Sequence, residues 1–253
     1  MAAAAAALLG GCSAGTSSIQ APPAAGPTGP APGTGTPSAS ATPAMTPTAL
    51  STPAAPQKLR VGAKGAAVLA VQQRLTALGY WNGRADGHFG GVTQQAVYAL
   101  QKAAGLTRDG VVGPKTQQAL AAGVRPAARS TKGHVVEIDK TRQLLLIVDN
   151  GHVSQIFNTS TGSGKQYVYE GKTYTARTPS GHFVVSRQID GQRVGPLGPL
   201  WRPKYFNGGI AVHGAPAIPP YPASHGCARL SNAAMDWIWS AGRIPLKTAV
   251  WVY

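Results

Sequence analysis

The sequence is poor in cysteine and in acidic residues. Its 253 residues include two cysteines, Cys12 and Cys227, and eight acids against 23 Lys and Arg. So few cysteines exclude a disulfide-rich scaffold. The net charge of +15 favours a polyanionic partner but does not choose among nucleic acid, anionic lipid and anionic wall polymers. Lys and Arg never occur side by side and no nucleic-acid motif is present, so we expect no nucleic-acid partner.

Charge is also missing from the beginning of the chain, where no Lys or Arg precedes Lys58. The apolar run at 2–9 is too short to span a bilayer, which takes about 20 residues. Its length suits a secretory signal, although such a signal ordinarily begins with Lys or Arg. The following Leu9–Cys12 resembles a bacterial lipobox. That resemblance implies that residues 1–12 form a lipoprotein signal and that Cys12 is lipidated.

Residues 13–57 contain no charged side chain and consist almost entirely of Ala, Pro, Thr, Ser and Gly. Such a stretch has too little apolar surface to offset the entropy of ordering. We therefore expect a disordered linker. It would let a lipid-anchored protein act outside the cytoplasm, away from its membrane.

An internal repeat marks residues 58–123 as a separate module. Segment 86–97 matches segment 109–120, and each copy begins with the turn-forming pair Asp-Gly. Thr93 and Thr116 are the expected N-caps of the helices that follow. Apolar residues at helical spacing, closed by a glycine, predict a helix before the repeat: Val68, Val71, Leu75, Leu78 and Gly79. The sequence therefore predicts a small all-α module of three helices.

This module resembles the peptidoglycan-binding type 1 domain over nearly its whole length. The matching positions include Val71-Gln72, Leu78-Gly79-Tyr80, Asp86-Gly87, Phe89-Gly90, Thr93, Gln101, Asp109-Gly110, Val112-Gly113 and Thr116. Most are turn or core positions, so they support the fold directly and imply a glycan partner only by resemblance. His88 has only Asp86 beside it as a further ligand type, so we expect no metal and no cofactor.

After a short linker at 124–132, residues 133–253 change to a β pattern. Asp149-Asn150-Gly151 predicts a hairpin, because Asn-Gly accepts the positive φ values of a type I′ turn. One helix is expected at 232–241, with Ser231 as its cap. The expected strands are 134–139, 144–148, 153–157, 183–186, 210–213 and 249–253. The pattern predicts a mostly-β domain, sandwich-like or barrel-like, with one main helix.

Cys227 is the only cysteine outside the predicted lipid site, in the segment Ser224–Arg229. A thiol of pKa about 8.5 needs a base to become a nucleophile, and a neighbouring imidazole would give a thiolate–imidazolium pair. His225 is close in sequence, but neighbours on one strand rarely align for proton transfer. His213 can approach from a separate strand. The residues alone therefore favour His213 as the base.

His213-Gly214 followed by Ser224–Arg229 resembles the signature of the L,D-transpeptidases, the YkuD family, and Thr178–Phe183 resembles that family's Thr-Pro-x-Gly-x-Phe turn. The resemblance covers about 133–253. It implies a cysteine acyltransferase that forms 3→3 cross-links in peptidoglycan through a thioester. The implied roles are Cys227 as nucleophile, His213 as proton donor and acceptor, Gly214 as the carbonyl that orients His213, Ser224, His225 and Gly226 as the oxyanion and donor site, and Arg229 as a substrate-binding residue.

Other readings stay open. Water as acceptor would make the protein an L,D-carboxypeptidase, and an inert catalytic domain would leave a wall-binding lipoprotein. Sortases separate their Cys and Arg widely, and NlpC/P60 peptidases place cysteine before histidine, so both fit less well. The proline-rich loop 215–223 is shorter than is common in the family, which puts acceptor specificity in doubt. We expect a monomer whose partners are peptidoglycan stem peptides and glycan, anchored through Cys12 and reaching into the cell wall.

Overall fold

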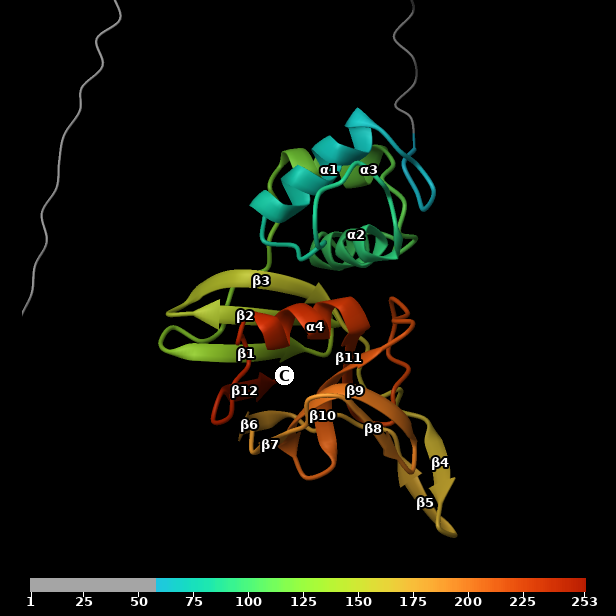
Figure 1. Ribbon diagram of the computed structural model, residues 1–253, viewed down its shortest axis with the longest axis vertical. Coiled ribbons are helices and arrows are strands. Elements are labelled where there is room, and N and C mark those ends of the chain that lie inside the picture. The colour runs from blue at the N-terminus through green and yellow to red at the C-terminus, as the bar shows by residue number, and fades with distance from the viewer. Residues whose placement is uncertain (1–57) are drawn as a thin grey trace, which may run out of the picture. The chain divides into compact units, whose positions relative to one another are not determined.

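The computed structural model describes residues 58–253. The predicted signal, the lipidation site Cys12 and the linker at 13–57 lie outside these residues. No helix within 58–253 is long and apolar enough to cross a bilayer. The described chain is a helical module followed by a mostly-β domain (Figure 1), as the sequence predicts.

The helical module contains α1 (Ala66–Ala77), α2 (Gly91–Ala103) and α3 (Pro114–Ala121). Gly79 follows α1 at φ 80°, where a glycine carries no steric penalty. The predicted N-caps are wrong: α2 and α3 begin after Gly90 and Gly113, and neither has a side-chain cap. Thr93 and Thr116 instead lie inside the first helical turn and are buried. Their hydroxyl groups instead accept hydrogen bonds from buried glutamine side chains.

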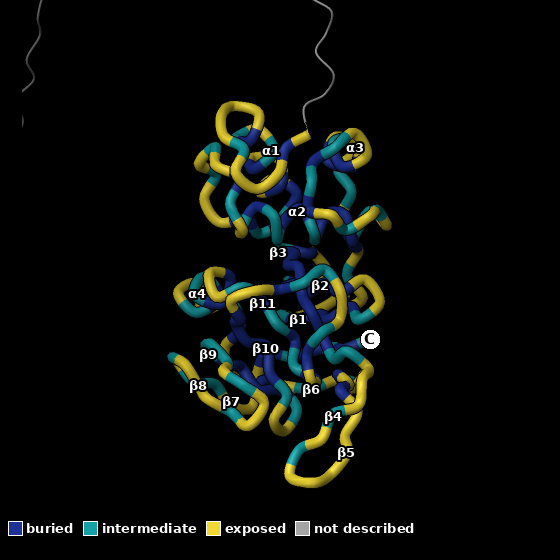
Figure 2. Tube along the Cα trace, turned by 90° about the vertical axis from the view of Figure 1, so that its right-hand side faces the viewer, coloured by how far each residue is buried: buried dark blue, intermediate teal, exposed yellow. Residues whose placement is uncertain are grey.

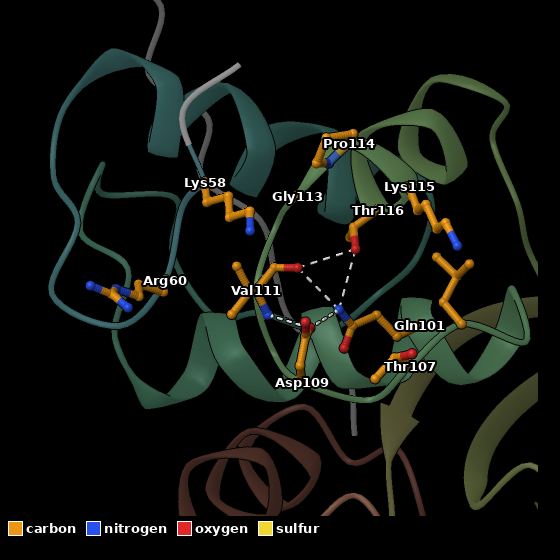
Figure 3. Close-up of a pocket in the computed structure, with 11 residues that line it drawn as sticks. Lys58, Arg60, Gln101, Thr107, Asp109, Val111, Gly113, Pro114, Lys115 and Thr116 are labelled. Carbon is orange, nitrogen blue, oxygen red and sulfur yellow. Dashed lines mark hydrogen bonds between the residues drawn. The ribbon is translucent and has the colours of Figure 1, made fainter. Parts of the chain in front are cut away.

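Each copy of the repeat is organised around one buried glutamine. Gln72 Nε2 donates to Asp86 Oδ1 and Thr93 Oγ1, both at 3.0 Å. Gln101 Nε2 donates to Asp109 Oδ1 at 2.6 Å and to Thr116 Oγ1 at 3.2 Å (Figure 3). A buried amide must satisfy its hydrogen-bonding groups, and the two Asp-Gly turns do this in the same way. The sequence repeat is therefore also a repeat of hydrogen bonding.

The β domain is built from two larger sheets and a hairpin. The first sheet has the order β3-β2-β1-β12-β6, and the second has β11-β10-β9-β7 with β8 also paired to β9. The strands and the helix of the whole β domain are β1 (His134–Asp139), β2 (Leu144–Asp149), β3 (His152–Asn158), β4 (Gln166–Tyr169), β5 (Lys172–Thr175), β6 (Gly181–Val184), β7 (Arg187–Gln188), β8 (Gln192–Gly195), β9 (Gly198–Asn207), β10 (Ile210–Ala215), β11 (Ala228–Ser231), α4 (Asn232–Ser240) and β12 (Ala249–Val252).

The first sheet is covered on both faces, which explains the unbroken apolar run of β2. Leu145 and Ile147 belong to a core shared by the two sheets and α4. Leu144 and Leu146 face the other way and share a core with the helical module. Figure 1 shows α2 beside β3, and Figure 2 shows the dark-blue, buried course of β1 and β2. A strand buried on both faces loses the alternating pattern of a half-exposed strand.

Two local predictions are confirmed, and one predicted strand begins earlier in the chain than expected. Asn150 and Gly151 have φ values of 49° and 82°, as the β2–β3 hairpin turn requires. The cap of α4 is also confirmed, since Ser231 Oγ accepts the Ala234 N–H at 3.2 Å. The strand expected at 183–186 is instead β6, which begins at Gly181. The sequence pattern does not predict the strands β4, β5, β7, β8, β9 and β11.

Candidate active site

Two parallel strands carry the central residues of the site. In the β10–β11 pairing, Val212 is opposite Ala228 and His213 is opposite Arg229. Residues opposite one another in a sheet project to the same face, and so do residues two apart on one strand. Cys227, directly before β11, therefore shares a face with His213 and Arg229. The sequence placed the histidine on a separate strand from the cysteine, and the structure brings the two together.

The Cys227 thiol is half-buried against the beginning of β10. The Ala211 N–H donates to Sγ at 3.4 Å, and Sγ lies 3.9 Å from Gly209 O. Burial raises the pKa of the Cys227 thiol, while the Ala211 N–H and the charge of Arg229 act in the opposite direction. Burial disfavours the charged form of any group. The free protein therefore holds this group mainly as a thiol.

His213 is 6% exposed and is oriented by its neighbour. Its Nδ1 lies 2.8 Å from Gly214 O, a contact in which Nδ1–H donates to the carbonyl. This tautomer leaves a lone pair on Nε2 for accepting a proton. Burial, assisted by the charge of Arg229, lowers the pKa of His213 to about 4, although the bond to Gly214 opposes the shift.

These two pKa directions bear on the expected thiolate–imidazolium pair. The pKa of Cys227 is raised and that of His213 is lowered, so both groups favour their neutral forms in the free protein. Both directions disfavour the expected resting ion pair. Burial is the largest cause of each shift, because it disfavours the charged form of both groups.

The turn before Cys227 is fixed by two hydroxyl groups. Ser224 Oγ donates to Cys227 O at 2.6 Å and accepts the Gly226 N–H at 3.1 Å. Thr178 Oγ1 donates to Gly226 O at 2.6 Å. Gly226 has φ 154°, and a Cβ there would lie 2.9 Å from Arg177 O. Thr178 was noted in the sequence only as part of a turn, and its contact with the cysteine segment is new.

His225 packs against the β4–β5 hairpin. Its side chain is exposed, and its ring packs edge-on against Tyr167 of the β4–β5 hairpin at a centroid distance of 4.7 Å. Both rings line the cavity that contains Cys227. The hairpin is largely exposed (Figure 2), so this contact joins it to the site. Sequence reasoning missed Tyr167.

Arg229 is anchored beside the reactive groups. Its Nη2 donates to Ser160 Oγ at 3.2 Å, and its backbone pairs with Ser160. Its Nε is buried and has no hydrogen-bond partner within residues 58–253. Arg229 lines the cavity that contains Cys227, and a guanidinium is suited to binding a substrate carboxylate.

Cys227, His213 and Arg229 line a cavity of about 750 Å³. Its wall contains four arginines and no acidic residue, which favours an anionic substrate. The charged and polar lining residues outside the central group are Arg177, Arg187, Arg193, Tyr167, Tyr174, Thr175, Tyr205, Ser224 and His225. A second hollow of about 720 Å³ lies in the helical module beside Gln101 and Lys115 (Figure 3), and it shares no residue with the first.

Comparison with known families agrees with this geometry. A family model described as the L,D-transpeptidase catalytic domain (YkuD) matches residues 133–252. A second, described as a putative peptidoglycan binding domain, matches residues 64–120. The two matches follow the division into a mostly-β domain and a helical module.

The chain is similar to an L,D-transpeptidase of known structure and to part of an amidase. An L,D-transpeptidase structure from Xylanimonas cellulosilytica is 56% identical, with a TM-score of 0.77, over 80% of this chain and 100% of that chain. The N-acetylmuramoyl-L-alanine amidase CwlL from Bacillus licheniformis is 46% identical over 78 residues. That match covers 30% of this chain and 22% of the relative, so the chain spans about a fifth of it.

The likeness to the Xylanimonas structure extends over nearly all the described residues and therefore includes both domains. The cysteine, histidine and cavity occur within the matched catalytic domain. The chain thus belongs to the YkuD family of L,D-transpeptidases and carries a peptidoglycan-binding domain ahead of its catalytic domain.

Proposed function

We propose that the protein forms 3→3 cross-links in peptidoglycan through a thioester on Cys227. The observation that carries this proposal is the shared face of His213 and Cys227, which opens into an arginine-lined cavity. His213 has an orienting carbonyl at Gly214 and a free lone pair on Nε2. A nucleophile, a base and an orienting group are the parts that covalent acyl transfer requires.

In the first half-reaction, Nε2 of His213 removes the proton from the Cys227 thiol as Sγ attacks the carbonyl carbon of the third residue of a tetrapeptide stem. The bond from that carbon to the nitrogen of the terminal D-Ala breaks. The imidazolium returns the proton to the departing amine. The product is an acyl-enzyme with a thioester bond to Cys227.

In the second half-reaction, an amine on the third residue of another stem attacks the thioester. The new amide joins two third residues, and Cys227 is released as a thiol after the proton passes through His213. Water in place of the amine would give a free carboxylate, which is the L,D-carboxypeptidase reaction. One cavity can support both, so the balance between them is decided by what reaches the thioester.

Other residues of the site act by position and charge. Ser224 and Gly226 hold the turn that presents Cys227, since the Gly226 N–H is already bonded to Ser224. We infer that this turn and His225 shape the oxyanion and donor side of the cavity. Arg229 lines the same cavity as Cys227 and supplies a positive charge that would bind a carboxylate of the stem.

The wider proposal concerns location. We infer that the helical module binds glycan, that Cys12 carries lipid, and that the monomer works outside the cytoplasm within the wall. Support comes from the peptidoglycan-binding match and from the lipobox-like residues 9–12. Incorporation of radiolabelled lipid that is lost in Cys12→Ala would support the anchor. No incorporation in the native protein would reject it.

Purified disaccharide-tetrapeptide, analysed by mass spectrometry, tests the activity. The proposal expects loss of D-Ala and a cross-linked dimer. Monomeric tripeptide alone would identify the carboxypeptidase. Neither product, with a reactive positive control, would leave a wall-binding protein without activity.

A further inference from the structure

The loop between the histidine and the cysteine forms part of the cavity wall. It runs from Ala215 at the end of β10 to Ala223, directly before the turn that presents Cys227. Ala215 and Pro216 line the cavity, and so does Ser224 beyond the other end of the loop. The conformation of residues 215–223 therefore sets the shape of the site beside the thiol.

Two of the carbonyl groups in this loop are held by the helical module. Gln95 on α2 donates from Nε2 to Ile218 O at 3.2 Å. Arg108, in the segment after α2, donates from Nη1 to Pro220 O at 3.0 Å. A third carbonyl, that of Tyr221, accepts from Ser160 Oγ of the catalytic domain at 2.8 Å. The loop is thus fixed from both domains.

The α2 helix is itself attached firmly to the end of β3. Lys102 donates from Nζ to Gln143 O at 2.8 Å, to Thr159 O at 2.9 Å and to Asn158 Oδ1. Lys102 is 2% exposed, and a buried amine needs all of these acceptors. Asn158 Nδ2 in turn donates to Gln95 Oε1 at 2.5 Å. Gln95 therefore joins α2, β3 and the loop in one network.

The same network reaches the substrate side of the site. Thr159 Oγ1 donates to Arg229 O at 2.9 Å, and the next residue, Ser160, pairs with the Arg229 backbone. Trp81 of the module stacks on Phe157 of β3 at 5.9 Å, which adds an apolar contact. A module that served only as a tether would not need the hydrogen bonds from Gln95 and Arg108 to a loop of the active site.

We propose that the helical module is a structural part of the active site, and that Gln95 and Arg108 are positioning residues that fix the loop 215–223 beside Cys227. This inference rests on the proposed transferase function. The proline-rich loop is short, so two hydrogen bonds from the module determine much of its placement. Substrate fit, and above all the fit of the acceptor, then depends on a domain that does not contact the thiol.

The test compares Gln95→Met, Arg108→Met and the double variant with native protein. Gln118→Met and Arg84→Met are matched controls, because both residues are exposed on the module and neither contacts the loop. We expect the double variant to lower kcat/KM for cross-linking about tenfold, mainly through KM for the acceptor. Arg108→Lys keeps a donor and should recover most of the Arg108→Met loss. Alkylation of Cys227 by iodoacetamide should change by less than twofold.

Three results would overturn the inference. One is a double variant with the kcat/KM of the controls. Another is an equal fall in alkylation and cross-linking together with a collapsed near-UV circular dichroism spectrum, which would show a general loss of packing. The last is failure of Arg108→Lys to recover activity in a folded protein.

The proposed function fails separately, if native protein makes no product. Hydrogen exchange of the peptide covering 215–224 then decides the inference without activity. Faster exchange in the double variant than in the controls supports it, and equal exchange overturns it.

Discussion

The His213 side chain lies on the same face of the β10–β11 pair as the Cys227 thiol, because His213 pairs with Arg229, two residues after the cysteine. The relationship needs two parallel strands from separate parts of the chain. It accounts for the choice between two histidines, since His225 points to Tyr167 instead.

The first prediction separates the two histidines. His213→Gln removes the proton acceptor and should lower kcat/KM by about 10²–10⁴. His225→Gln removes only an exposed ring at the cavity wall and should cost less than tenfold. Steady-state kinetics on the tetrapeptide donor measures both. A larger loss in His225→Gln than in His213→Gln would exchange their roles.

The second prediction concerns the pH dependence of alkylation. The pKa of the Cys227 thiol is raised, so its thiolate fraction increases with pH across the neutral range. The rate of alkylation by iodoacetamide should therefore rise about tenfold for each pH unit between pH 6 and 8. Intact-mass measurements over time give the rate. A resting thiolate–imidazolium pair would instead give a plateau over this range.

The third prediction concerns the acidic limit of turnover. Because the pKa of His213 is lowered to about 4, its imidazole remains a proton acceptor well below pH 6.5. The contribution of this group to kcat/KM should stay constant from pH 6.5 down to about pH 5. An unperturbed histidine, with a pKa of about 6.5, would lose about tenfold of its neutral form by pH 5.5. Steady-state kinetics on the tetrapeptide donor at each pH measures this limit.

The fourth prediction tests the packing behind His213. A Cβ at Gly214 would lie 2.7 Å from Asn232 Oδ1 and 2.9 Å from Trp201 Cδ1. Gly214→Ala should lower the free energy of unfolding by about 1–3 kcal/mol, because an overpacked site must shift. Gly209→Ala is the control, since a Cβ there meets nothing within 4 Å. Chemical denaturation of the two variants gives the comparison, and equal stabilities would contradict the packing described.

Local chemistry made part of the fold predictable. The turn at Asn150-Gly151 and the cap at Ser231 depend on a few neighbouring residues, and both are present. Strand β9 carries Pro199 and Pro203, which ordinarily argue against a strand, and it is held in the sheet by pairing with β7, β8 and β10. The strand propensities of its residues do not predict that pairing.

The active site, too, was predictable from the sequence only in part. The order of His213, Ser224 and Cys227 was readable because the chemistry requires those residue types. Gln95 and Ile218, which are hydrogen-bonded, lie 123 residues apart in the sequence, and no local sequence pattern predicts their contact. The directions of the pKa shifts of His213 and Cys227 were not predictable either, since their largest cause is burial by residues distant in sequence.

The most direct test of the account is intact-mass spectrometry of the protein during reaction with disaccharide-tetrapeptide. The account predicts a mass increase equal to the donor minus D-Ala, located at Cys227 after proteolysis and absent in Cys227→Ala. It also predicts that the cross-linked product disappears with the same substitution. Product that persists in Cys227→Ala, or an adduct on another residue, would contradict it.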